Sequence, residues 1–69
     1  MLSIRTQNRM ALVPYDDTIK LYEYSDNYYI QTKGRDLGTY ATKGRALEVL
    51  NSIQASVELE DLVYQMPIE

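Results

Sequence analysis

Two Lys-Gly-Arg triplets carry side chains and a backbone that suit the binding of an anion. The segment 32–35, Thr-Lys-Gly-Arg, recurs ten residues later as the segment 42–45. The second triplet falls in the first turn of a predicted helix, where free N–H groups and the helix dipole favour an anion. Arg adds the bidentate geometry that phosphate prefers. The candidate anion-binding residues are Lys33, Arg35, Lys43, Gly44 and Arg45.

A simpler interpretation is that the four charges of these triplets keep the surface solvated and pair with Asp36 and the acidic C-terminal segment. The spacing matches no established phosphate-binding motif. Both interpretations of the triplets therefore stay open at the level of the sequence.

Tyrosine provides the second candidate site, because all seven aromatic residues of the chain are Tyr. A Tyr ring combines apolar surface with a hydrogen-bonding hydroxyl group. A predicted hairpin places several of these rings and a basic residue on one outer face, namely Lys20, Tyr22, Tyr24 and Tyr29. Such a face can stack on nucleobases while its lysines contact phosphates. It can equally stabilise the sheet through cross-strand pairs or form a protein interface.

The residue types that most often carry catalysis or bind metals are missing or dispersed. The chain has no His and no Cys, so the usual general base, the thiol nucleophile and most zinc ligands are absent. The most compact carboxylate pair, Asp16 and Asp17, lies in a predicted turn where adjacent side chains diverge. The acids Glu58, Glu60 and Asp61 are typical of a solvated helix end. We therefore expect a protein that is no enzyme and has no catalytic residues, no metal and no cofactor.

Length and composition predict a single domain over residues 1–69 that gains stability from self-association. A chain of 69 residues buries only about 60% of its unfolded surface, and neither disulfides nor a zinc site can compensate. A homo-oligomer is therefore expected. No apolar run approaches the roughly 18 residues of a membrane helix, and the N-terminus lacks the layout of a signal peptide. These features predict a cytoplasmic protein without a membrane partner.

The charge is distributed unevenly along the chain. Residues 1–45 carry seven basic and five acidic side chains, whereas residues 46–69 carry five acids and no base, for a net charge of -3. Binding to nucleic acid normally needs a basic face that neutralises several phosphates. Direct nucleic-acid binding is therefore the least favoured of the binding classes.

The pattern of apolar residues predicts an α+β domain of two packed layers, in the order β-β-β-β-β-α-β. We expect an antiparallel sheet of about five to six strands with one helix packed on one face. The predicted strands cover residues 2–6, 10–13, 18–24, 28–33, 37–40 and 62–66. The helix should run from an N-cap at Thr42 to about Val57. Its predicted apolar stripe comprises Ala46, Leu47, Leu50, Ile53 and Val57.

Both hairpins have a predicted register. In the first, a three-residue loop at 7–9 sets Ile4 opposite Leu12 and Thr6 opposite Met10. The face predicted to be buried there comprises Leu2, Ile4, Met10 and Leu12. In the second, a two-residue turn at 26–27 gives the opposed pairs Tyr24 and Tyr29, Tyr22 and Gln31, and Lys20 and Lys33. Its core face then comprises Ile19, Leu21, Tyr28 and Ile30.

Four segments carry a resemblance to a known group of proteins. They are Ile-Arg-Thr-Gln at 4–7, Leu-Gly-Thr-Tyr at 37–40, Arg-Ala-Leu-Glu-Val-Leu-Asn-Ser-Ile-Gln at 45–54 and Val-Tyr-Gln-Met-Pro at 63–67. Together they resemble short, mostly uncharacterised proteins from phages and prophages of Gram-positive bacteria, over almost the whole chain. The resemblance brings no catalytic or ligand-binding pattern. It implies a role in a bacterial host cell, either inhibiting host machinery or sequestering nucleotide signals of antiphage immunity.

The leading hypothesis is a small, homo-oligomeric phage-type binding protein that sequesters an anionic nucleotide-like ligand. The ligand would be a cyclic nucleotide or another phosphate-bearing small molecule, held by the Lys-Gly-Arg triplets and nearby Tyr side chains. The alternative is an inhibitor that binds a host protein through the Tyr-rich sheet face or the acidic C-terminal segment.

Overall fold

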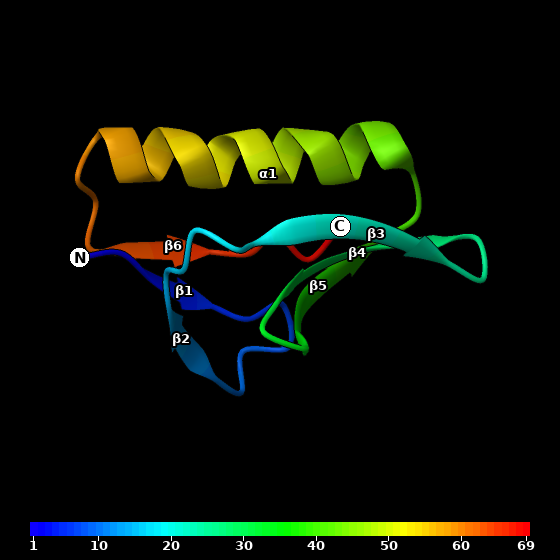
Figure 1. The fold of residues 1–69 in the computed structure, drawn as a ribbon, viewed down its shortest axis with the longest axis horizontal. Helices are drawn as coiled ribbons and strands as arrows, with labels where there is room; N and C mark the ends of the chain where they lie inside the picture. The colour runs from blue at the N-terminus through cyan, green and yellow to red at the C-terminus, as the bar shows by residue number, and fades with distance from the viewer.

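The computed structural model describes residues 1–69 and contains six strands and one helix (Figure 1). The elements are β1 Ser3–Arg5, β2 Leu12–Pro14, β3 Lys20–Tyr24, β4 Asn27–Thr32, β5 Arg35–Tyr40, α1 Lys43–Glu58 and β6 Val63–Gln65. The predicted order of elements and the α+β class are confirmed. The helix lies across the strands as a separate layer, and the core is between the two layers (Figure 1).

The six strands are divided between two three-stranded sheets, in the orders β2-β1-β6 and β3-β4-β5. The second sheet is an antiparallel meander, as local hairpins favour. In the first sheet β1 and β6 are parallel, with Ile4 opposite Tyr64. This pairing brings the two ends of the chain side by side. The connection between β1 and β6 is long and includes α1. Local sequence patterns do not indicate such a pairing.

The predicted register of the first hairpin is wrong by one residue. Ile4 is opposite Val13 rather than Leu12, and Thr6 bonds to Ala11 rather than facing Met10. As a result Val13 packs against the core, whereas Leu12 and Met10 are exposed. A shift of one residue exchanges the two faces of a strand, which is why half of the predicted core face points outward.

The cause of this shift is a loop that is longer than three residues. The Asn8 side-chain oxygen accepts hydrogen bonds from the Thr6 hydroxyl and from the Met10 N–H, and Arg9 takes a φ of 67°. Such side-chain bonds to neighbouring backbone stabilise a wide turn. Each residue of β1 is therefore paired with a residue of β2 that lies one position later in the chain than predicted.

The second hairpin turns at Ser25 and Asp26, one residue before the predicted turn. Both residues have positive φ angles, 50° and 63°, which the two-residue turns of right-twisted hairpins require. The observed pairs are Tyr24 with Asn27, Tyr22 with Tyr29, and Lys20 with Gln31. The predicted opposition of Lys20 and Lys33 is therefore wrong, because Lys33 lies in the next turn.

Each strand of this hairpin nevertheless keeps its predicted faces. Moving a turn by one residue shifts every cross-strand pair by two, and two is the side-chain period of a strand. Ile30 is fully buried, and the other predicted core residues pack against it or its neighbours, namely Ile19, Leu21 and Tyr28. The Tyr-rich face is consequently turned away from the core, as predicted.

The helix begins as predicted, with Thr42 as N-cap accepting a hydrogen bond from the Arg45 N–H at 3.2 Å. Its buried face differs from the predicted stripe. The residues that reach the core are Ala46, Val49, Ile53 and Ser56. Leu47 is exposed, and Leu50 and Val57 are half-buried at the margin. The apolar pattern is compatible with a helix that buries Leu47 and with one that buries Val49. Contact with the sheet selects the rotation of the helix that buries Val49.

Candidate functional site

The two Lys-Gly-Arg triplets lie at opposite ends of β5. Lys33 and Gly34 form the turn before this strand, with φ angles of 50° and 79°, and Arg35 is its first residue. Lys43 and Arg45 follow its last residue. Six strand residues span roughly 20 Å. The triplets therefore do not converge on one ligand within a single chain.

Lys33 is paired with an acid of the same chain. Its Nζ lies 2.9 Å from Oδ2 of Asp16, and Asp16 also accepts hydrogen bonds from the N–H and hydroxyl of Thr18. The bond from the Thr18 hydroxyl, followed by that from Lys33, lowers the pKa of Asp16 to about 2. The same pairing raises the pKa of Lys33. The charge of Lys33 is thus partly offset before any ligand arrives.

Lys33 and Arg35 line a hollow of about 350 Å³ between β2 and the turn that joins β4 to β5. Its remaining wall comprises Leu12, Val13, Pro14, Tyr15, Asp16 and Thr32. Thr32 is only 3% exposed, and its Oγ1 has no hydrogen-bond partner. Buried hydroxyl groups normally have such a partner. The hollow therefore combines two cations, one acid and an apolar wall, and a residue with a buried unsatisfied hydroxyl lies beside them.

The second triplet is partly committed to contacts within the chain. Arg45 donates from Nε to the Glu69 carbonyl oxygen at 3.0 Å and from Nη1 to Glu48 at 3.3 Å. Lys43 has no ion-pair partner and lines a hollow of about 210 Å³ beside the β3–β4 hairpin. A side chain added at Gly44 would meet nothing within 4 Å, so the backbone there is open. Only Lys43 and Gly44 of this triplet remain uncommitted.

The outer face of β3 and β4 carries an ordered tyrosine surface. The rings of Tyr22 and Tyr29 are stacked, with centroids 5.1 Å apart and planes at 17°. Tyr24, on the same face, is 66% exposed. Asp36 stands beside the stack and accepts a hydrogen bond from Gln31 at 3.0 Å. We refer to Lys20, Tyr22, Tyr24, Tyr29 and Gln31 as the tyrosine face.

The electrostatic environment of this face is less basic than the sequence indicated. Partial desolvation raises the pKa of Tyr22, and the negative charge of Asp36 raises it further. Lys33 is turned away into its pair with Asp16, so Lys20 is the only cation on the face. An acid at the edge of the stack disfavours a phosphate there and leaves a contact surface that is mainly aromatic.

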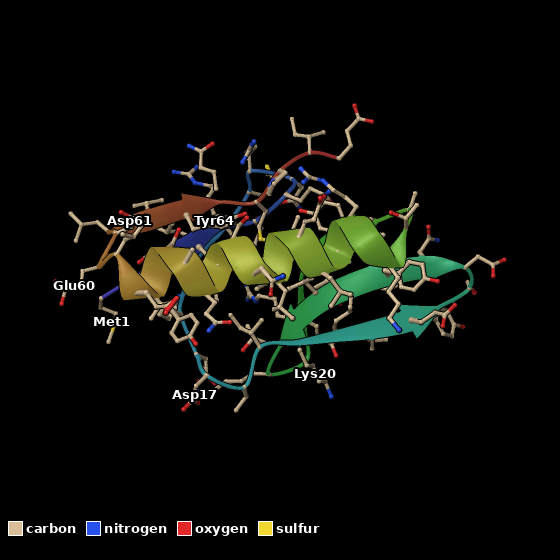
Figure 2. All side chains as sticks on the ribbon, turned by 90° about the horizontal axis from the view of Figure 1, so that it is seen from above. Met1, Asp17, Lys20, Glu60, Asp61 and Tyr64 are labelled. Carbon is tan, nitrogen blue, oxygen red and sulfur yellow. The ribbon has the colours of Figure 1, made fainter.

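The acidic C-terminal segment forms a separate exposed surface. Glu60 and Asp61 lie near Met1 at one end of the molecule (Figure 2), opposite the end that holds the β3–β4 turn (Figure 1). Leu59 and Leu62 are each 73% exposed beside these acids. This acidic end is therefore a contact area separate from the β3–β4 turn.

Gln7 is a central residue that sequence patterns assigned only to a loop. Its Nε2 donates to the carbonyl oxygens of Thr39 at 3.0 Å, Pro67 at 3.2 Å and Ile68 at 2.7 Å. Its Oε1 accepts from the Thr39 N–H at 2.9 Å, and its own N–H donates to Leu37 at 2.9 Å. Gln7 thereby joins the loop after β1, the edge of β5 and the C-terminal residues.

Three segments that are distant from one another in the sequence meet at this junction. They are the segments 4–7, 37–40 and 63–67. The Tyr40 hydroxyl donates to the Pro67 carbonyl at 2.8 Å, and burial raises the pKa of Tyr40 to about 12. Met66, which is fully buried, approaches Gly38 closely. These residues hold the two sheets together, so their role in this chain is structural.

The fold and its exposed surfaces define a small α+β domain with two candidate contact areas and a hollow beside Lys33 and Arg35. Comparison with protein-family models, curated proteins and solved structures finds no match for the chain. No group of His, Cys, Asp or Glu side chains is arranged to hold a metal ion. The structure also has no helix with the length and apolar character needed to cross a membrane.

The pair between Asp16 and Lys33 predicts a pH dependence of stability. The pKa of Asp16 is about 2 in the folded protein, against an ordinary value of 3.8. Asp16 therefore contributes stability that is fully present above about pH 4 and is lost as the pH falls towards 2. Urea unfolding between pH 5 and pH 2 should show a smaller acid-induced loss in Asp16→Asn than in the unaltered protein. Asp17→Asn serves as the control, and an equal loss in all three proteins would contradict the assignment.

Proposed function

We propose that this protein is a non-enzymatic binding protein that contacts another protein through its tyrosine face. The observation that carries the proposal is the stacked, half-buried pair of Tyr22 and Tyr29, with the exposed Tyr24 on the same face. Tyr is enriched at protein interfaces because it supplies a large contact area with two rotatable side-chain angles and a polar tip. The separation of the two triplets supports this reading over capture of one anion by both.

The resemblance to short phage proteins supplies a context for this contact. A phage-type protein in the cytoplasm of a bacterial host would act through protein contacts, and it would need no catalytic groups for that. The exposed apolar and acidic residues after α1 offer a further contact area, but the tyrosine face has the stronger preorganisation. Its rings are held by a two-residue turn and by cross-strand stacking before any partner binds.

The test is an affinity purification of the tagged protein, followed by identification of the proteins that are recovered with it. The Gram-positive expression host also produces an untagged copy of the same chain. Tyr24→Arg should reduce the recovered partner about tenfold or more, as expected when a central aromatic contact is lost. Asn51→Arg, on the exposed side of α1, adds the same charge away from the face and should change nothing. Equal recovery with both variants would overturn the proposal, provided that circular dichroism shows both to be folded.

The second candidate function is sequestration of a phosphate-bearing small molecule, and the hollow beside Lys33 and Arg35 supports it. Two cations and Thr32 share its wall, and the hydroxyl of Thr32 is buried without a hydrogen-bond partner. A cyclic nucleotide could place its phosphate between the cations and its base against the apolar side. This would keep the sequestering role predicted from the sequence, with one triplet rather than two as the anion site.

Thermal unfolding with a panel of cyclic nucleotides and with inorganic phosphate tests this second function. At least one compound should raise the melting temperature by mass action. Arg35→Ala should abolish the rise, whereas Lys43→Ala, at the other end of β5, should preserve it. If no compound shifts the melting temperature, or if Lys43→Ala has the larger effect, the hollow is not the binding site.

A further inference from the structure

Three of the four sheet edges are protected against pairing with another chain. The edge strand β2 has three residues and ends at Pro14, which has no N–H to donate. The edge strand β6 also has three residues, and the chain turns away at Pro67. The edge of β5 is occupied by Gln7, which bonds to Leu37 and Thr39.

The remaining edge, β3, is five residues long and uncovered. In Figure 2 it runs along one margin of the molecule, outside the helix, with Lys20 pointing away. Proteins usually protect an edge strand of this length, because its free backbone groups can pair with another chain. Charged residues on β3 give it only partial protection.

The free groups of this edge can be assigned from the hairpin. A two-residue turn closes on a hydrogen-bonded pair, here Tyr24 and Asn27, and hydrogen-bonded and non-bonded pairs then alternate. Tyr22 therefore bonds to β4, while the N–H and C=O of Leu21 and Glu23 point outward. No hydrogen bond outside the sheet ladders reaches these groups.

We propose that the partner of the tyrosine face is a second copy of this chain, paired with β3 in antiparallel fashion about a two-fold axis at Tyr22. This inference rests on the proposed function and names its partner. The axis sets Leu21 opposite Glu23 of the partner subunit, so that the outward N–H and C=O groups of both chains are satisfied. Pairing of the two β3 strands would join both meanders into one continuous sheet. The small core of each chain favours this additional burial.

The side chains select this register over its neighbours. Tyr22 meets Tyr22 of the partner subunit at the axis, which extends the Tyr22–Tyr29 stack across both chains. Lys20 lies opposite Tyr24 of the partner subunit, where cation and ring attract each other. An axis at Glu23 would instead oppose two acids. An axis at Leu21 would place Glu23 against Ile19 of the partner subunit and Tyr24 against Thr18 of the partner subunit, which lies in the turn before β3.

The absence of cysteine allows a clean test by disulfide formation. At a non-hydrogen-bonded antiparallel pair the Cα atoms are about 4.5 Å apart, within the disulfide range of roughly 4.4–6.8 Å. Tyr22→Cys should therefore form a covalent dimer as its major species on mild oxidation. Tyr29→Cys is the matched control, because it breaks the same ring stack but lies one strand away from the edge. Its Cα atoms would be about 14 Å apart in the dimer, too far for a disulfide.

The expected result is a dimer by light scattering for the unaltered protein, with cross-linking of Tyr22→Cys and none of Tyr29→Cys. A monomer by light scattering, or equal cross-linking of both variants, would overturn the inference. A cross-link from Leu21→Cys in place of Tyr22→Cys would overturn the register. If the protein is monomeric but Tyr24→Arg still loses a host partner, the inference fails while the proposed function stands.

Discussion

Replacing Gln7 with Leu is expected to lower the free energy of unfolding by about 3 kcal/mol. The replacement has a similar volume, but it removes the amide that bonds to Thr39, Pro67 and Ile68. The N–H of Thr39 would then lie half-buried without an acceptor, and leaving a buried donor unsatisfied costs its full desolvation penalty. The loss should be large because one side chain holds three segments of the chain.

Urea unfolding of Gln7→Leu and of Gln65→Leu measures this effect. Gln65 is exposed on β6 and makes no side-chain hydrogen bond, so its replacement should change stability by less than about 0.5 kcal/mol. Amide hydrogen exchange adds a local readout, because the Thr39 N–H should lose its protection in Gln7→Leu. Equal stability of the two variants would show that the Gln7 junction contributes little.

The second large effect is expected for Gly38→Ala, which should destabilise the fold by roughly 1–3 kcal/mol. A methyl group at Gly38 would lie 3.0 Å from Cε of Met66 and 3.1 Å from the Tyr40 hydroxyl oxygen. Met66 is fully buried, and the Tyr40 hydroxyl is held by its bond to Pro67, so neither atom can move away freely. The C-terminal residues should loosen first.

Gly44→Ala is the matched control for this substitution. Its added methyl group would meet nothing within 4 Å, and Ala is favoured over Gly in a helix by roughly 0.5–1 kcal/mol. Thermal unfolding should therefore move in opposite directions for the two variants, down for Gly38→Ala and up for Gly44→Ala. A loss of stability in both, or in neither, would mean that the packing around Met66 is looser than these distances indicate.

Both predictions connect the fold to the proposed contact. The junction around Gln7 fixes the edge of β5, and β5 in turn aligns β4 and the tyrosine face. Variants that weaken the junction should therefore also weaken dimer formation. Variants of Tyr24 should weaken binding while leaving the junction intact.

The order of the elements and the buried faces of the second hairpin follow from local patterns in the amino-acid sequence. Thr42 marks the helix start because its side chain can cap a free N–H group, and this capping is local. The alternation in the second hairpin assigned Tyr22 and Tyr29 to the outer face even though the predicted turn was one residue off. Side-chain periodicity survives such an error, because it depends only on whether a position is odd or even.

The registers, the division into two sheets and the positions of the charged side chains depend on how the segments pack in space. Turns at Ser25 and Arg9 use positive φ angles that residues other than glycine adopt rarely, so their types gave no signal. The parallel pairing of β1 with β6 and the contact of Gln7 with Ile68, 61 residues away, depend on how the layers pack. The two Lys-Gly-Arg triplets looked like one site in the sequence. They are separate because the strand between them is extended, and a strand holds its two ends apart.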